Sequence, residues 1–577
     1  MARPNQIAGP VNSIRGLFLT HTVMGSRPRT RPTLLVLTGR LAVLLAIAVA
    51  LALTAAAAAR AGTIVADSGF RATPNGFSFQ NYGDAEGYAG LNAVDMQLIF
   101  GDGVCVVGKG AKCVLTPGAR YWMNDMNGSM AGGHCYGMAM LASITQRQQL
   151  PRFGISSIAA LGGGPNAFDL EIKDNRALQR AIARAFSMQG VSSVIRGTVR
   201  GTPKQILEKL KQELTSSNPA TWQFGIFQWG MQGGHAITPY AVEDMGGGIY
   251  DVHVYDNNWP GDDDRRLTID TNKDTWKYFA ATNPSETGSW YIGNAKSGTL
   301  RLMPNQPAFG TQECPVCVGR QGLKSKYNQI SLSGMPGETA HVVITDPKGR
   351  KLGVIGGKLV NQIPGARAYP RTSGPVATAT GELSNLDDTI DPVYELPRGL
   401  KLKIKVDGRK LTDEVKQSLT VVGPTFDSTA ERIRLGPGQV AHATLNPKRQ
   451  TLSFTARRRA AFPKVSFGAE SRSAAYSVRV ATPGAPAGTT VFFAKKPRYG
   501  MLRIAPKSKR RQAFRVIVNR LDANGEAEFS RSYSIRGRQQ AYLYYGPLAR
   551  KNGVARIVIG VPGKEAQAKI LKLRRTG

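Results

Sequence analysis

A chain of 577 residues is longer than one hydrophobic core usually supports, so we expect two to four domains. Apolar residues make up 42% of the sequence, which excludes a wholly disordered chain. The net charge of +36 is unevenly placed, because residues 320–577 hold 47 basic and 17 acidic residues while residues 62–319 hold 21 and 22. A nearly neutral half is therefore joined to a strongly basic half.

The N-terminal segment has the pattern of an export signal. Arginines lead into the apolar run LAVLLAIAVALALTAAAAARAG, which ends in small residues. This order is typical of a cleaved signal peptide, but the stretch Leu41–Ala59 is also about long enough to span a membrane. Residues 1–61 are thus predicted to be a signal peptide or an N-terminal membrane anchor. Either one predicts an exported protein, secreted or held at the outer face of the cytoplasmic membrane.

Residues 62–319 form the first predicted domain. Helical patterns cover about 136–150 and 174–189, and a third helix is predicted to begin with Thr202 as N-cap, Pro203 at the first position and Gln205 completing a capping box. Strand-like segments follow, including GGHAITPYAVED and GGIYDVHVYDNNWPG. Helices followed by antiparallel strands predict an α+β fold.

Beyond about residue 320 the helical signals nearly vanish, and only 411–419 looks helical. Asn524-Gly525 between two strand-like runs predicts a β-hairpin. We expect one or two basic, β-sandwich-like modules. If there are two, they are residues 320–425 and 426–577, separated within VVGPTFDSTAER (421–432). No internal repeat is evident.

The five cysteines carry information because exported cysteines tend to pair. Cys105 and Cys113 bracket a short glycine loop, and Cys314 and Cys317 form a CxxC motif that has no second motif nearby to complete a zinc site. Two local disulfides are the predicted arrangement. They leave Cys135 as the unpaired thiol, at the start of a predicted helix.

A partner for this thiol is sought among six histidines. His134 is adjacent to Cys135 and cannot readily face it, so a solvated loop position is expected. If the loop of the next hairpin is Asp244–Gly247, His235 faces Asp256, and a one-residue shift brings Asn257 there instead. His253 falls on the opposite face of its strand and is assigned to packing or solvent.

Cys135, His235 and Asp256, with Asn257 as the alternative to Asp256, can therefore form a catalytic triad. The helix N-terminus stabilises a thiolate, the imidazole takes its proton, and the third residue orients the imidazole. A buried structural cysteine and a turn histidine are the alternative interpretation.

The segments GGHCYGMAM, GGHAITPYAVED and VYDNNWPG, in this order, resemble papain-like cysteine peptidases, particularly the bacterial C39-like branch. The resemblance covers about residues 115–300 and implies a nucleophile at the start of a central helix, with the histidine and the acid or amide on adjoining antiparallel strands. These families usually carry a glutamine about six residues before the cysteine, whereas Ser129 stands here. Asn127 is a candidate replacement that would donate to the oxyanion.

The predicted function is an exported thiol hydrolase, a peptidase or amidase that acts through a thioester on Cys135. Transpeptidase chemistry would use the same residues, and a non-catalytic envelope or adhesion protein is the alternative from another class. No cofactor or metal is expected. The basic half predicts anionic envelope polymers or a membrane surface as partners, and no nucleic-acid motif is present.

Overall fold

The computed structural model describes residues 62–577 except 84–85, 216, 219, 229–233, 282–287, 315, 318–326, 334–339, 357, 370–390, 424–426, 456–461, 509, 550–552, 564–566 and 577. The predicted signal peptide or anchor, residues 1–61, lies outside this part of the chain. Within it, no helix is both long and apolar enough to cross a membrane.

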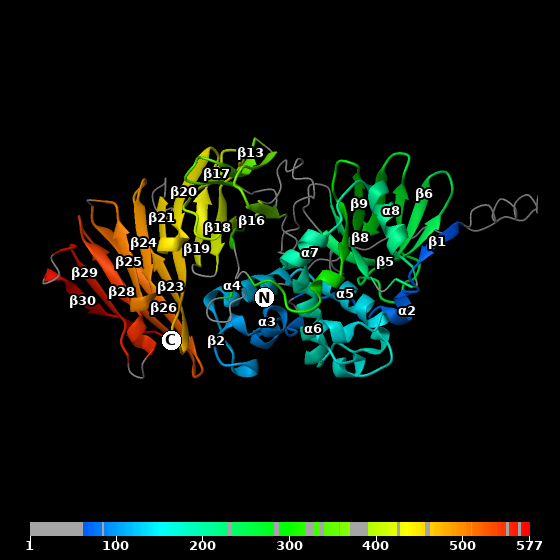
Figure 1. The fold of residues 1–577 in the computed structure, drawn as a ribbon, viewed down its shortest axis with the longest axis horizontal. Coiled ribbons are helices and arrows are strands. Elements are labelled where there is room, and N and C mark those ends of the chain that lie inside the picture. Colours follow the sequence, from blue (N-terminus) through cyan, green and yellow to red (C-terminus); the bar gives the residue numbers. More distant parts are fainter. Residues whose placement is uncertain are drawn as a thin grey trace, which may run out of the picture. The chain divides into compact units, whose positions relative to one another are not determined.

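The helices lie in the N-terminal half (Figure 1). They are α2 (Ala72–Asn75), α3 (Ala93–Phe100), α4 (Pro117–Ser129), α5 (Cys135–Gln146), α6 (Arg176–Ser187), α7 (Ser192–Gly197) and α8 (Pro203–Glu213). The helix α8 begins with the predicted capping box. Thr202 Oγ1 accepts a hydrogen bond from the Gln205 backbone N–H, and Gln205 Oε1 accepts one from the Thr202 backbone N–H.

An antiparallel sheet, here called sheet 1, completes this half, with the strand order β10-β4-β5-β6-β7-β8-β9 and with β1 also paired to β5. Its strands are β1 (Thr63–Asp67), β4 (Trp222–Phe227), β5 (Gly234–Asp244), β6 (Ile249–Tyr255), β7 (Arg266–Asp270), β8 (Thr275–Ala280), β9 (Ser289–Asn294) and β10 (Leu300–Pro304). A separate short pair is β2 (Cys105–Val107) with β3 (Val114–Leu115). Helices packed with an antiparallel sheet confirm the α+β class.

The helix α5 is the central element of this half. Its residues from Tyr136 to Ile144 are all buried, and it packs on both α6 and β5. Gly137 makes the contact with α6 close, because a Cβ there would lie 2.2 Å from the Ile182 carbonyl oxygen. The first residue of this rigidly packed helix is Cys135.

The basic half consists of two further antiparallel sheets. Sheet 2 contains β11 (Tyr327–Ser333), β15 (Arg367–Tyr369), β16 (Val393–Pro397), β18 (Val415–Val422), β19 (Ser428–Leu435), β22 (Lys464–Glu470), β23 (Ala474–Ala481), β26 (Gln512–Asp522), β27 (Gly525–Ile535) and β31 (Arg574–Arg575). Sheet 3 contains β12 (His341–Thr345), β13 (Lys351–Ile355), β14 (Lys358–Asn361), β17 (Leu402–Gly408), β20 (Gln439–Asn446), β21 (Thr451–Thr455), β24 (Thr490–Lys496), β25 (Met501–Pro506), β28 (Gln540–Tyr544), β29 (Arg556–Gly560) and β30 (Lys569–Lys572).

The two sheets share one hydrophobic core that runs from Ile330 to Leu573. The boundary expected near residue 425 falls in the connection between β18 and β19, and both sheets continue across it. The predicted helix at 411–419 is wrong: Val415–Val422 is a strand whose alternate side chains enter this core, so tertiary pairing overrides local propensity. The Asn524-Gly525 hairpin is confirmed, with Asp522 paired to Gly525.

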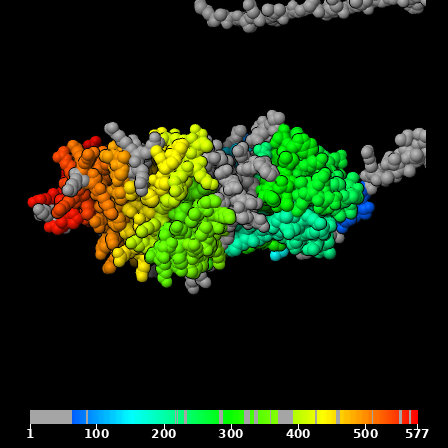
Figure 2. Space-filling model, turned by 90° about the horizontal axis from the view of Figure 1, so that it is seen from above, coloured from blue at the N-terminus to red at the C-terminus, as the bar shows by residue number. Residues whose placement is uncertain are grey.

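From β18 onward the chain places one hairpin in sheet 2 and the next in sheet 3, and the colours in Figure 2 accordingly pass in chain order along this half. The hairpins β20–β21 and β24–β25 are related by a shift of 50 residues, since Leu445 pairs with Leu452 and Lys495 pairs with Leu502. Both turn through a 3-10 segment that begins with proline, Pro447–Arg449 and Pro497–Tyr499. The structure thus contains a repeat that the sequence pattern did not reveal.

Candidate functional site

Cys135 lies at the N-terminus of α5, with His134 as its N-cap. All five cysteines of the sequence lie among the described residues, and Cys135 alone is free and half-buried. The predicted disulfides are confirmed, with S–S distances of 2.05 Å for Cys105–Cys113 and 2.15 Å for Cys314–Cys317. The amide groups of the first helical turn point toward the thiol end of the helix and favour negative charge there.

His235, near the start of β5, is paired with Asp256, which directly follows β6. The distance from His235 Nε2 to Asp256 Oδ1 is 2.7 Å, and both side chains are fully buried. Asp256 also accepts hydrogen bonds from the Asn258 backbone N–H at 2.9 Å and from the Tyr278 hydroxyl at 2.7 Å. These donors hold the carboxylate in one orientation toward the imidazole.

The electrostatics of the pair favour an imidazolium–carboxylate state. Burial alone lowers the pKa of His235, but the charge and hydrogen bond of Asp256, with a further contribution from Cys135, outweigh it and raise this pKa to about 10. Burial alone would raise the pKa of Asp256, but His235, the Asn258 N–H and the Tyr278 hydroxyl lower it below its ordinary value. Cys135 and Ala236, the residue after His235, both accept a hydrogen bond from the Asn257 side chain, which brings the start of α5 beside His235.

The strand register that brings His235 to Asp256 differs from the predicted one. Asp244 pairs with Tyr250 and, beyond a bulge, Thr238 pairs with Tyr255. The turn lies at Gly246–Gly248, three glycines that all have positive φ. Asp256 reaches His235 because the chain turns directly after β6, where Trp259 N–H donates to the Asp256 carbonyl.

Asn257 does not replace Asp256 at the imidazole. Its Nδ2 donates to the carbonyl oxygens of Cys135 at 3.1 Å and of Ala236 at 3.0 Å. One side chain therefore ties the first turn of α5 to β5, beside His235. Asn257 belongs to the site as a brace between the two elements that carry the thiol and the imidazole.

A segment near the beginning of the described chain also touches the site. Asn81 Oδ1 accepts from His134 N–H at 2.7 Å, and the Asn81 N–H donates to the Asn257 carbonyl at 2.8 Å. Gly133, with φ +147°, leaves room for the Asn81 amide, because a Cβ would lie 2.8 Å from its Nδ2. Asn81 thus joins the residue before Cys135 to the residue after Asp256.

Two histidines have other partners. His134 was expected to be solvated, but it is buried. Its ring stacks on Tyr82 with a centroid distance of 4.2 Å, and its Nδ1 lies 2.7 Å from the Tyr82 carbonyl oxygen. The burial follows from the N-terminal segment, which covers this loop. His253 lies away from the thiol, and its Nε2 is 2.9 Å from Glu243 Oε2.

Both polar atoms of the Asn127 side chain bond to the backbone of Leu91. Its Oδ1 accepts from Leu91 N–H at 2.8 Å, and its Nδ2 donates to the Leu91 carbonyl at 3.1 Å. Ser129, at the usual glutamine position, donates to the Asp125 carbonyl within α4.

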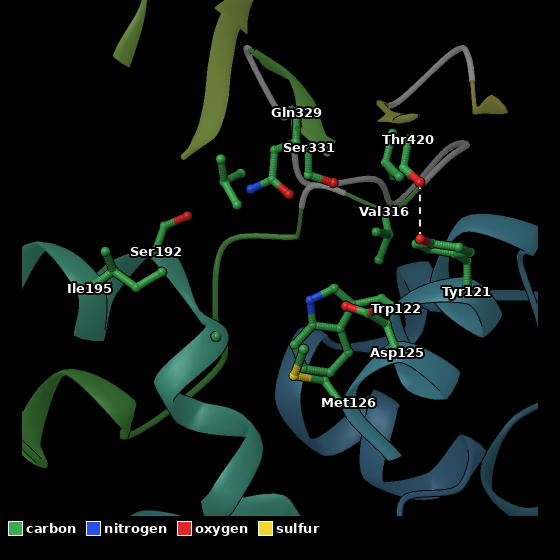
Figure 3. A pocket seen from close by; sticks show the side chains of 13 residues that line it. Tyr121, Trp122, Asp125, Met126, Ser192, Ile195, Val316, Gln329, Ser331 and Thr420 are labelled. Atoms are coloured by element: carbon green, nitrogen blue, oxygen red, sulfur yellow. Dashed lines mark hydrogen bonds between the residues drawn. The ribbon is translucent and has the colours of Figure 1, made fainter. Parts of the chain in front are cut away.

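Sequence reasoning missed Asn81, Asn258 and Tyr278. Asn258 was within reach, since it directly follows the Asp256-Asn257 pair. The other two come from distant segments, and no local motif marks them. A separate pocket between α4, α7 and strands β11 and β18 (Figure 3) includes Trp122 and Thr420 but none of the triad residues. Among the described residues no group of histidine, cysteine and acidic side chains is arranged to hold a metal.

Comparison with known proteins finds no family model, no curated protein and no solved structure that matches the chain.

Proposed function

We propose that the chain is an exported thiol hydrolase, a peptidase or amidase with a papain-like arrangement of Cys135, His235 and Asp256. The observation that carries the proposal is the buried His235–Asp256 pair, 2.7 Å apart, next to the one cysteine of the sequence that is not in a disulfide. A thiol at a helix N-terminus and a histidine held by a carboxylate are the groups that acyl transfer requires. The two disulfides support an oxidising, extracytoplasmic location.

The reaction follows from these positions. His235 holds the proton taken from Cys135 as an imidazolium, and the thiolate sulfur attacks the carbonyl carbon of a peptide or amide bond. The N–H of Cys135, at the start of α5, donates to the developing oxyanion. His235 returns the proton to the leaving amine, and water then hydrolyses the thioester with His235 again acting as base.

Alkylation of the full chain with iodoacetamide across pH 5 to 9 tests the proposal. We expect wild-type Cys135 to react at pH values where a free thiol is slow, because a neighbouring imidazolium stabilises the negative sulfur. His235→Ala should remove this reactivity, and Asp256→Asn should reduce it by roughly 100-fold or more, as a lost orienting carboxylate does in other triads.

His253→Ala is the matched control, because His253 pairs with Glu243 outside the site. The enzyme proposal would be refuted if wild-type Cys135 reacted at the rate of a free thiol and His235→Ala did not change that rate. The non-catalytic envelope protein would then be the remaining interpretation. Addition of an amine acceptor separates hydrolysis from transpeptidation, since only a transpeptidase forms the new amide with it.

We further propose that the basic half holds the protein on anionic polymers of the cell envelope. Lys448 and Arg449 at the β20–β21 turn are exposed, as are Lys496 and Arg498 at the β24–β25 turn. None of the four forms an ion pair with another described residue. The backbone N–H of Lys495 donates to the Gln450 carbonyl, so the two turns are neighbours. They lie two strand spacings apart, a distance of about 9.5 Å.

Retention on an immobilised anionic polysaccharide, measured against salt concentration, tests this tether. Lys448→Gln with Arg449→Gln should weaken retention and flatten its salt dependence. Lys416→Gln with Lys464→Gln removes the same charge from exposed positions on sheet 2 and should have less effect. An equal loss of retention in both variants would mean that the overall positive charge binds the polymer, and not these two turns in particular. Retention on anionic vesicles but not on the polysaccharide would favour a membrane surface as the partner.

A further inference from the structure

A lysine occupies a core position in the repeat of the basic half. Lys495 is inward-facing on β24, and its side chain is 8% exposed. The equivalent position 50 residues earlier holds Leu445, which is fully buried. Leu445 pairs across the strands with Leu452, just as Lys495 pairs with Leu502. Burial of an ammonium group is costly without specific partners, so the substitution of lysine for an apolar residue calls for an explanation.

The partners of Lys495 are a carboxylate and a carbonyl group. Its Nζ lies 3.5 Å from Asp427 Oδ1 and donates to the Gly468 carbonyl oxygen at 2.6 Å. Glycine is needed at 468, because a Cβ there would lie only 1.6 Å from Asp427 Oδ2. The backbone thus leaves space for the Asp427 carboxylate directly beside the amine.

A second acid completes the cluster. Glu470 follows on the same strand as Gly468, and burial, together with the charge of Asp427, raises its pKa to about 7 against the opposing effect of Lys495. The rings of Tyr476 and Tyr545 pack against each other in a tilted arrangement, with centroids 5.3 Å apart, and the charges of Asp427 and Glu470 both act on Tyr545. Lys495 is therefore buried beside two acids, of which Glu470 can hold a proton near neutral pH.

We propose that Lys495 and Asp427 form an intramolecular amide bond. The bond joins Lys495 Nζ to Asp427 Cγ, and one carboxylate oxygen leaves as water. Of the three ammonium hydrogens, one stays on the amide nitrogen and two leave with that oxygen, so the reaction is balanced without any other reactant. Glu470 carries protons from nitrogen to oxygen, and the remaining N–H can keep its bond to the Gly468 carbonyl.

The geometry suits this condensation. The amine nitrogen lies 3.5 Å from an oxygen of the Asp427 carboxylate, and fixed proximity of the two groups replaces a bimolecular step. The link would connect the start of β19 in sheet 2 with β24 in sheet 3. It would close a long loop across the sandwich and oppose separation of the two sheets.

Tandem mass spectrometry of the full chain, digested under denaturing and reducing conditions, decides the question. The expected result is a branched peptide that contains Asp427 and Lys495 and weighs one water less than its two parts. Recovery of both residues only in separate linear peptides would overturn the proposal and leave a buried ion pair. The wild-type protein gives this answer without reliance on any variant.

Variants test the assigned roles. Lys495→Arg and Asp427→Ala should yield only linear peptides, and Lys495→Arg should lower the melting temperature. Glu470→Gln keeps the side-chain shape and should slow or prevent the link. Lys496→Arg, one residue away on the exposed turn, is the matched control and should keep the branched peptide. A link that persists at full yield in Glu470→Gln would refute the role of Glu470, and one that persists in Lys495→Arg would refute the assigned bond. These outcomes are independent of Cys135 chemistry.

Discussion

At the scale of single residues, we expect the pair His235–Asp256 to set both the reactivity of the thiol and the pH dependence of the fold. Each partner is buried, so each would be unfavourable alone. Asp256 is held by the Asn258 N–H in its own turn and by the Tyr278 hydroxyl on β8, and His235 is held by Asp256. A substitution of one residue therefore leaves the other as a buried group with an unsatisfied charge or hydrogen bond.

This coupling predicts a defined pH window for stability. The pKa of His235 rises from 6.5 to about 10 on folding, so its contribution is complete below pH 6.5 and is lost as the pH rises through 10. The pKa of Asp256 falls below 3.8, so its contribution is present above pH 3.8 and is lost in acid.

We expect the protein with His235 to have a larger free energy of unfolding than the His235→Gln variant. The difference should be largest between pH 3.8 and 6.5 and should shrink toward pH 10. Urea unfolding of both proteins in a Cys135→Ser background measures it. A difference that grows from pH 6.5 to 10 would contradict the assigned direction.

Asn81 is the second residue at this scale, because it links the loop before Cys135 to the segment after Asp256. Asn81→Ala should lower the alkylation rate of Cys135 by roughly 5- to 10-fold, equivalent to about one hydrogen bond. Asn81→Asp retains the acceptor for His134 N–H and should recover part of the rate. If the two variants behave alike, the bond to His134 is not what positions the thiol.

At the scale of elements, the position of Cys135 depends on the packing of α5 against α6. A Cβ on Gly137 would lie 2.2 Å from the Ile182 carbonyl oxygen and 2.8 Å from the Phe186 backbone nitrogen. Both contacts are backbone atoms, which cannot move aside as a flexible side chain can. The interface therefore depends on glycine at this position.

Gly137→Ala should lower the free energy of unfolding by about 1–3 kcal/mol, the usual cost of overpacking a core. Gly128→Ala in α4 is the control, because a Cβ there meets no atom within 4 Å, and it should be neutral or slightly stabilising. Thermal unfolding of both variants is the measurement. Equal effects would mean that the helix contact tolerates a methyl group.

At the scale of the whole molecule, the basic half behaves as one folding unit because a single core spans it. A protein that ends at residue 425 would retain β11 to β18. It would lose β19, the neighbour of β18 in sheet 2, and β20, the neighbour of β17 in sheet 3. We expect it to be far more sensitive to protease than a protein that ends at residue 319. Similar resistance of the two would show that residues 320–425 fold separately.

The sequence by itself determined much of the chemistry. Cysteine spacing in an exported chain identified both disulfides and left Cys135 over, and the glycine-histidine hairpin pointed to His235 and Asp256. Such features are local, because turn residues, caps and short-range pairs depend on neighbours in the chain. The same reasoning misread 411–419, where pairing with β11 and β19 outweighs a weak helical pattern.

Only the tertiary structure decided the rest. The choice of Asp256 over Asn257 as the partner of His235 depends on a bulge and on the turn after β6, which no alternation pattern shows. Asn81, Tyr278 and the Lys495–Asp427 contact join residues far apart in the chain, and their meeting depends on how sheets stack. Local rules fix which groups are available, whereas long-range packing fixes which of them touch.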